Sequence, residues 1–148
     1  MYNTLATDLI NAIKTQDTAK LSTLRCLKSS LTNYAIDKRV SVDRLADIDV
    51  TAIIRKEIKK CQDAADGFKL GNRLDSMKIE LDNIKVLSSY LPAELSANAL
   101  DQLITTSIAE AQATSKKQMG LAMKIAIHKS KGQVSTQVLS TEIGKRLK

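Results

Sequence analysis

The amino-terminal part of the chain carries two stripes of apolar residues at the three- and four-residue spacing of an α-helix. The first stripe predicts a short helix that ends near Thr15, with Asn3 as its candidate N-cap. The second predicts a longer helix that Asp17 caps and that ends near Asp37. The stripes consist of Leu5, Leu9 and Ile13 in the first helix, and of Leu21, Leu24, Leu27, Leu31 and Tyr34 in the second.

Residues 38–46 carry no such stripe and are predicted to form a loop. Two further stripes follow, and the pair Gly71 and Asn72 separates them. Because glycine and asparagine terminate helices and form tight turns, these stripes predict a long antiparallel helical hairpin. The stripes consist of Val50, Ile53, Ile54, Ile58, Cys61, Ala65 and Phe68, and then of Met77, Leu81, Ile84 and Leu87.

The only proline, Pro92, marks the strongest candidate boundary, because proline forces the preceding residue out of helical conformation. Three shorter stripes follow it, behind Ser96, Ser115 and Ser135 as candidate N-caps, and the middle helix is expected to end near His128. The sequence therefore predicts an all-α fold with two domains. Residues 1–92 form a helical domain of about four helices, and residues 93–148 form a three-helix module.

Composition supports a packed helical protein outside the membrane. Hydrophobic residues make up 43% of the chain and aromatic residues only 3%, a balance that favours helices over sheets. No apolar run approaches the roughly 20 residues of a membrane-spanning helix. Residues 1–15 lack the regions of a secretory signal, and the acidic Asp8 argues against a mitochondrial transit peptide. We therefore expect a cytoplasmic protein with no membrane partner.

The charge is distributed unevenly along the chain. Residues 116–148 hold eight basic residues against one acid, whereas residues 1–115 hold fifteen of each, so the whole excess of +7 falls in the last segment. Such asymmetry is typical of a chain with an anionic partner, most often a nucleic acid, although a merely solvated basic helix would show it too. The candidate RNA-binding residues are Lys116, Lys117, Lys124, Lys129, Lys131, Lys145 and Arg146.

A continuous helix through this segment would align several of these bases. At about 100° per residue, Lys124 lies at about 340° from Lys117, His128 at about 20° and Lys131 at about 320°. Gly120 borders this stripe and would permit either close helix packing or the approach of another backbone. His128 can equally be an ordinary surface residue. The opposite, core-facing side holds Met119, Met123 and Ala126.

Four segments resemble the YqeY family in order and spacing, over nearly the full length of the chain. They are residues 24–29 (LRCLKS), 55–60 (RKEIKK), 90–96 (YLPAELS) and 119–124 (MGLAMK). The C-terminal module of that family is similar to the tail domain of the B subunit of the aspartyl/glutamyl-tRNA amidotransferase, which contacts tRNA. The resemblance implies a tRNA-like partner for residues 93–148. Where the family usually shows an Asp-Gly pair, this chain has Lys131 and Gly132 followed by Gln133.

No catalytic, cofactor or metal site is predicted from the sequence. The chain has one histidine, His128, and two cysteines, Cys26 and Cys61, which sit within apolar helical patterns where burial would make their thiols inert. These three residues are too widely separated for the clustered ligands of a zinc site. There is no glycine-rich phosphate loop.

These observations predict a non-catalytic accessory protein whose module contacts structured RNA through a basic helix face. No aromatic residue follows Tyr90, so the module cannot stack unpaired bases, and tRNA is the favoured RNA by resemblance. The N-terminal helices would serve as a scaffold or a protein-docking surface. One alternative is an amidotransferase-like protein that contributes to carbon–nitrogen ligation, with glutamine as amido donor, only together with a partner. Another is an adaptor whose basic segment binds an acidic protein.

Overall fold

The computed structural model describes residues 1–148, and it contains helices and connecting segments with no strand. The predicted all-α fold is confirmed. The chain divides into two compact units, Met1–Leu91 and Pro92–Lys148, and the division lies one residue before the boundary that the sequence predicts. None of the helices is both long enough and apolar enough to cross a lipid bilayer.

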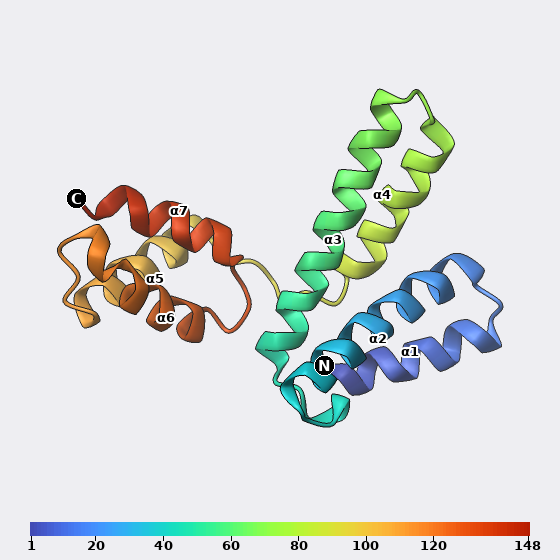
Figure 1. Ribbon diagram of the computed structural model, residues 1–148, viewed down its shortest axis with the longest axis horizontal. Helices are drawn as coiled ribbons and strands as arrows, with labels where there is room; N and C mark the ends of the chain where they lie inside the picture. The colour runs from blue at the N-terminus through green and yellow to red at the C-terminus, as the bar shows by residue number, and fades with distance from the viewer. The chain divides into compact units, whose positions relative to one another are not determined.

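The first unit is built from two helical hairpins (Figure 1). The longer hairpin pairs α3 with α4, and its turn contains Asn72 in the left-handed conformation with a φ of 55°. The other hairpin pairs α1 with α2, and α2 also packs against α3 and α4. The elements of this unit are α1 (Tyr2–Lys14), α2 (Thr18–Lys38), the 3-10 turn η1 (Val42–Arg44), α3 (Asp47–Leu70) and α4 (Leu74–Ser88).

The core of this unit lies where α2 meets the base of the α3–α4 hairpin. Leu27 and Leu31 of α2 are fully buried there with Ile54 of α3 and Leu87 of α4. The predicted cap of α2 is confirmed, because the Lys20 backbone N–H donates to Asp17 Oδ1 at 3.1 Å. Towards their far end, α3 and α4 extend beyond the shorter hairpin (Figure 1).

The predicted N-cap of α1 is wrong. The helix begins at Tyr2, so Asn3 lies inside its first turn, and the capping residue is Met1. Tertiary contacts place this end of the helix: the amino group of Met1 lies 3.2 Å from Asp47 Oδ1, and the Thr51 hydroxyl lies 3.7 Å from the Met1 sulfur. The partners of Met1 lie far along the chain, so the sequence around α1 does not predict where the helix begins.

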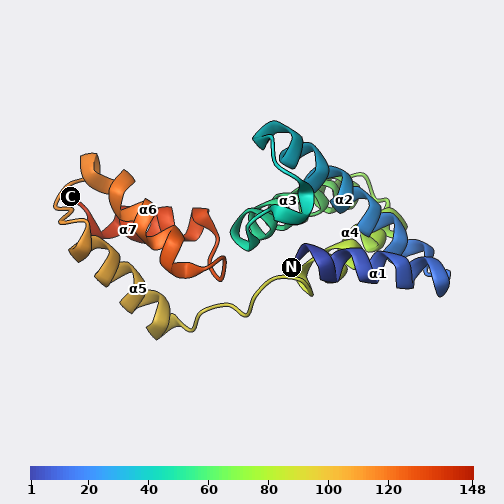
Figure 2. The same ribbon diagram turned by 90° about the horizontal axis from the view of Figure 1, so that it is seen from below.

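The second unit contains three helices and one 3-10 turn, and its helices are labelled in Figure 2. They are α5 (Ala97–Glu110), η2 (Lys116–Gln118), α6 (Met119–Ser130) and α7 (Thr136–Arg146). The predicted caps Ser96 and Ser135 are confirmed, since each side-chain oxygen accepts a 3.3 Å hydrogen bond from a backbone N–H three residues later. Ile104 of α5 and Leu139 and Ile143 of α7 are fully buried against α6.

The middle helix of this unit differs from its prediction at both ends. Ser115 caps the 3-10 turn η2, and the α-helix begins only at Met119. At the other end α6 continues past His128 to Ser130 and then stops, because Lys131 takes the left-handed conformation with a φ of 48°. Gly132 follows with a φ of 80°, which glycine adopts without strain.

Candidate nucleic-acid interface

Helix α6 has one apolar side that is buried and one side that is exposed. Ala122 and Ala126 are fully buried in the core of the unit, and Met119 and Met123 pack half-buried beside them. The core position predicted for both methionines is confirmed. The exposed residues of α6 are Gly120, Leu121, Lys124, His128 and Lys129.

A capping box fixes the approach to α6. The Ser115 side chain accepts from the backbone of Gln118, and the Gln118 Oε1 accepts from the backbone N–H of Ser115 at 3.4 Å. These reciprocal bonds hold the turn that carries Lys116 and Lys117. The backbone N–H of Lys116 also donates to the carbonyl of Lys148 at 3.1 Å, which joins the start of this turn to the last residue.

The predicted single stripe of bases is broken by this geometry. Lys117 lies in η2, where the chain turns by about 120° per residue rather than about 100°. Lys131 lies beyond the helix in the left-handed conformation. The stripe inside α6 is therefore reduced to Lys124 and His128, and Lys117 and Lys131 flank the helix.

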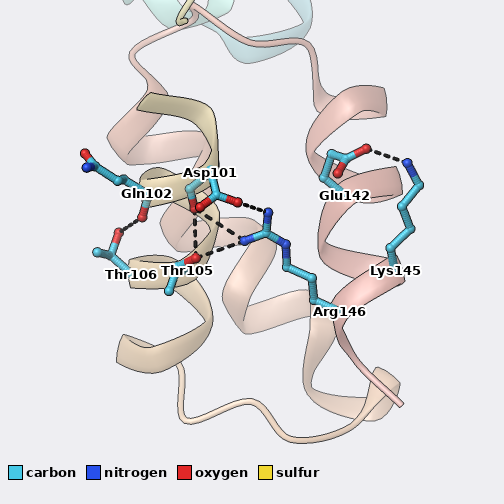
Figure 3. A network of polar contacts seen from close by, with 7 residues as sticks. All are labelled: Asp101, Gln102, Thr105, Thr106, Glu142, Lys145 and Arg146. Atoms are coloured by element: carbon cyan, nitrogen blue, oxygen red, sulfur yellow. Dashed lines mark hydrogen bonds and ion pairs between the residues drawn. The ribbon is translucent and has the colours of Figure 1, made fainter. Parts of the chain in front are cut away.

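Three of the predicted RNA-binding bases are engaged within the unit. The Arg146 guanidinium pairs with the Asp101 carboxylate and donates to the Thr105 hydroxyl at 2.9 Å, so it joins α7 to α5 (Figure 3). Lys145 pairs with Glu142 one turn earlier in α7, at 2.7 Å (Figure 3). Lys129 at the end of α6 forms an ion pair with Glu110 of α5.

The other four predicted bases are exposed, and their ammonium groups form no ion pair or hydrogen bond in the unit. They are Lys116, Lys117, Lys124 and Lys131. Lys148, which the sequence-based set of candidates omitted, is exposed and unpaired in the same way. Lys148 lies at the end of the basic segment, and this position was the signal by which the sequence could have included it among the candidates.

Counting by structural unit changes the charge balance. Residues 92–148 carry eight basic and four acidic residues, a net charge of +4, and residues 1–91 carry the remaining +3. Three of the four acids are the partners of Arg146, Lys145 and Lys129. Residues 111–141 contain no acid at all. The unpaired lysines therefore lie in or beside a continuous acid-free segment.

The predicted burial of both cysteines is wrong for Cys26, which is exposed on α2, and Cys61 is only half-buried on α3. Burial, together with a hydrogen bond to Glu80, raises the pKa of the Cys61 thiol to about 11, so this thiol is protonated at neutral pH. His128 is exposed on α6, in the other unit.

No group of three or more His, Cys, Asp or Glu side chains is arranged to hold a metal ion. An apolar hollow between α1 and α2, lined by Leu5, Leu24 and Leu31 among others, has room for about one water molecule at most.

Comparison with known proteins places the chain in a family. Residues 2–147 match the family described as Yqey-like protein. An uncharacterised protein of the fission yeast Schizosaccharomyces pombe is 31% identical over 88 residues, which cover 60% of this chain and 69% of the yeast protein. Because the family match extends over nearly every residue of both units, the chain belongs to the Yqey-like protein family.

Proposed function

We propose that this protein is a non-catalytic accessory protein that binds structured RNA, tRNA-like in shape, through the basic surface of its second unit. The observation that carries the proposal is the set of four exposed lysines without intramolecular partners, Lys116, Lys117, Lys124 and Lys131, on and around α6. The similarity of this module to the tRNA-contacting tail of an amidotransferase subunit supports RNA as the partner. The first unit then serves as a scaffold or a protein-docking surface.

The division between paired and unpaired bases narrows the set of contact residues. A lysine that already neutralises a carboxylate gains less from a phosphate, because binding must first break or share its existing pair. Lys129, Lys145 and Arg146 are held in this way. We therefore assign the main phosphate contacts to the four unpaired lysines.

A matched pair of variants tests this assignment. The test variant replaces Lys116, Lys117, Lys124 and Lys131 by Gln. The control replaces Lys56, Lys59, Lys69 and Lys78, which are also exposed and unpaired, in the first unit. Each variant loses four positive charges, so a difference in RNA binding between them reports the position of the lysines and not the net charge.

Binding to unmodified tRNA is measured for both variants across a series of salt concentrations. The wild type and the control should show a log–log dependence of affinity on salt with a slope of about −3, because about four phosphate contacts each release counterions. The test variant should bind severalfold more weakly at low salt, with a slope closer to zero. Equal losses in the two variants, or wild-type binding that ignores salt, would contradict the proposal.

A further inference from the structure

The exposed side of α6 differs in composition from an ordinary solvated helix face. Solvated faces usually mix charges of both signs, whereas the exposed residues of α6 include no acid, amide or hydroxyl group. Leu121 leaves 54% of its surface exposed in the middle of this basic surface. An apolar side chain between unpaired cations suits a ligand that offers both apolar and anionic groups.

Gly120 has no structural explanation within the chain. Glycine is less favourable than alanine inside a helix, and Gly120 does not have the positive φ that would require it. A Cβ built on Gly120 would meet no atom within 4 Å, so close helix packing, one of the two interpretations open from the sequence, is wrong. The open surroundings permit another backbone to approach Gly120 from outside the chain. Gly67 and Gly144 are equally open, and what distinguishes Gly120 is its position beside unpaired lysines.

The surroundings of Gly120 indicate what that backbone is. Lys124 follows it by four residues, one turn along α6, and Lys117 lies three residues before it in the turn η2, so an unpaired lysine lies on each side of Gly120 along the chain. No carboxylate occurs between residues 111 and 141 to repel an anion. A sugar–phosphate backbone supplies both the close approach and the negative charge.

We propose that the exposed side of α6 lies across the minor groove of double-helical RNA, an inference that rests on the proposed function. Gly120 is the point of closest approach of the RNA backbone, Leu121 contacts ribose, and Lys117 and Lys124 bind phosphates on either side. The target within a structured RNA is thus a base-paired stem and not a loop.

The side chains of the second unit favour a base-paired RNA stem over a single strand or a DNA duplex. Single-strand binding uses aromatic residues that stack on bases, and residues 92–148 contain no Phe, Tyr or Trp. Base reading in the DNA major groove pairs adenine with Asn or Gln and guanine with Arg or Lys, and the exposed face of α6 has lysines but no Asn, Gln or Arg. The wide, shallow minor groove of an RNA duplex is instead recognised by shape and through phosphates and 2′-hydroxyls, for which lysines and a smooth surface suffice.

Gly120→Ala in the full-length chain tests the proposal, because it adds one methyl group at the assigned contact. Gly67→Ala and Gly144→Ala are matched controls, since both residues are helical glycines where an added Cβ would also meet nothing within 4 Å. All three variants should raise the Tm by a few degrees, because alanine is the better helix former. Only Gly120→Ala should weaken binding to a fully paired RNA hairpin, by severalfold.

The class of RNA is tested with the wild-type chain and three fluorescent probes of equal charge: the RNA hairpin, an unpaired RNA strand and a DNA duplex of the hairpin sequence. The hairpin should bind severalfold more tightly than either of the others at the same salt concentration. Equal or tighter binding of the single strand or of the DNA duplex would overturn the assignment of α6 to a stem.

The outcomes separate this inference from the proposed function. If Gly120→Ala lowers the Tm, the glycine has a role inside the fold and the inference fails. It fails equally if Gly120→Ala binds the hairpin like the wild type, and the proposed function then still stands provided that the four-lysine variant loses tRNA binding. Wild-type protein that binds no RNA but binds an acidic polypeptide would refute both.

Discussion

The hydroxyl of Tyr90 donates a 2.6 Å hydrogen bond to Oδ2 of Asp8, so the segment after α4 is joined to the first helix of the same unit. The two residues are 82 positions apart in sequence, and both are half-buried. Burial, reinforced by the neighbouring carboxylate, raises the pKa of Tyr90 well above its ordinary value. This bond holds the end of the first unit, which is Leu91, close to its first helix.

Tyr90→Phe should destabilise the first unit by about 1–2 kcal/mol, because it removes a hydrogen bond to a carboxylate that remains half-buried. Urea denaturation followed by circular dichroism measures the change. Tyr2→Phe is the control, since the Tyr2 hydroxyl has no hydrogen-bond partner and the same oxygen is removed. A midpoint that shifts as much for Tyr2→Phe as for Tyr90→Phe would show that the bond to Asp8 contributes nothing.

The same bond predicts a loss of stability in alkali. Because the folded state raises the pKa of Tyr90, the unfolded chain loses this proton first, and the stabilisation is complete below pH 10.0 and declines as the pH rises further. Tyr34, whose pKa burial and Asp49 also raise, acts in the same direction. Tyr90→Phe should therefore reduce the fall in unfolding free energy between about pH 10 and 11 without abolishing it.

The two cysteines should differ in reactivity. Cys26 is exposed, whereas Cys61 is half-buried with its pKa raised to about 11, which leaves roughly a hundredfold less thiolate than an ordinary cysteine at neutral pH. Alkylation with iodoacetamide at pH 8, followed by mass spectrometry of the Cys26→Ala and Cys61→Ala variants, gives each rate separately. Cys26 should be modified first. Comparable rates would mean that Cys61 is neither shielded nor held protonated.

Arg146 is expected to act mainly in the fold of the second unit. Arg146→Gln breaks the link to Asp101 and Thr105 between α7 and α5, and it should cost about 1 kcal/mol because the side chain is only partly exposed. Lys145→Gln removes an exposed pair within α7 and should cost almost nothing. Thermal unfolding measures both. Equal losses of stability from the two substitutions would show that the link between α7 and α5 contributes no more than the exposed pair within α7.

The non-catalytic part of the proposal has its own test. Purified protein, with or without ATP, should release no more ammonia from glutamine than a variant with Cys26→Ala, Cys61→Ala and His128→Ala. The reason is that glutamine hydrolysis needs an activated nucleophile, whereas the half-buried Cys61 thiol is held protonated. Ammonia above the level of the triple variant would favour the amidotransferase-like alternative.

Much of the fold could be predicted because its signals are local. The apolar spacing of Leu24, Leu27 and Leu31 reports a helix face wherever that helix packs. Asp17 and Ser135 cap their helices through bonds to the backbone three residues later, so neighbouring sequence suffices to identify them. Asp17 and Ser135 were accordingly predicted correctly, whereas Asn3 was not, because contacts of Met1 with distant residues position the start of α1.

The candidate site depended on tertiary structure to a greater degree. The sequence located the basic segment, but whether a given base is free depends on acids far along the chain, such as Asp101 beside Arg146 and Glu110 beside Lys129. Likewise, Cys26 shares a helix with buried leucines yet is exposed, because no other element covers its position on α2. Spacing along a helix determines which residues share a face, whereas only the packing of helices determines which face is covered and which charges are already neutralised.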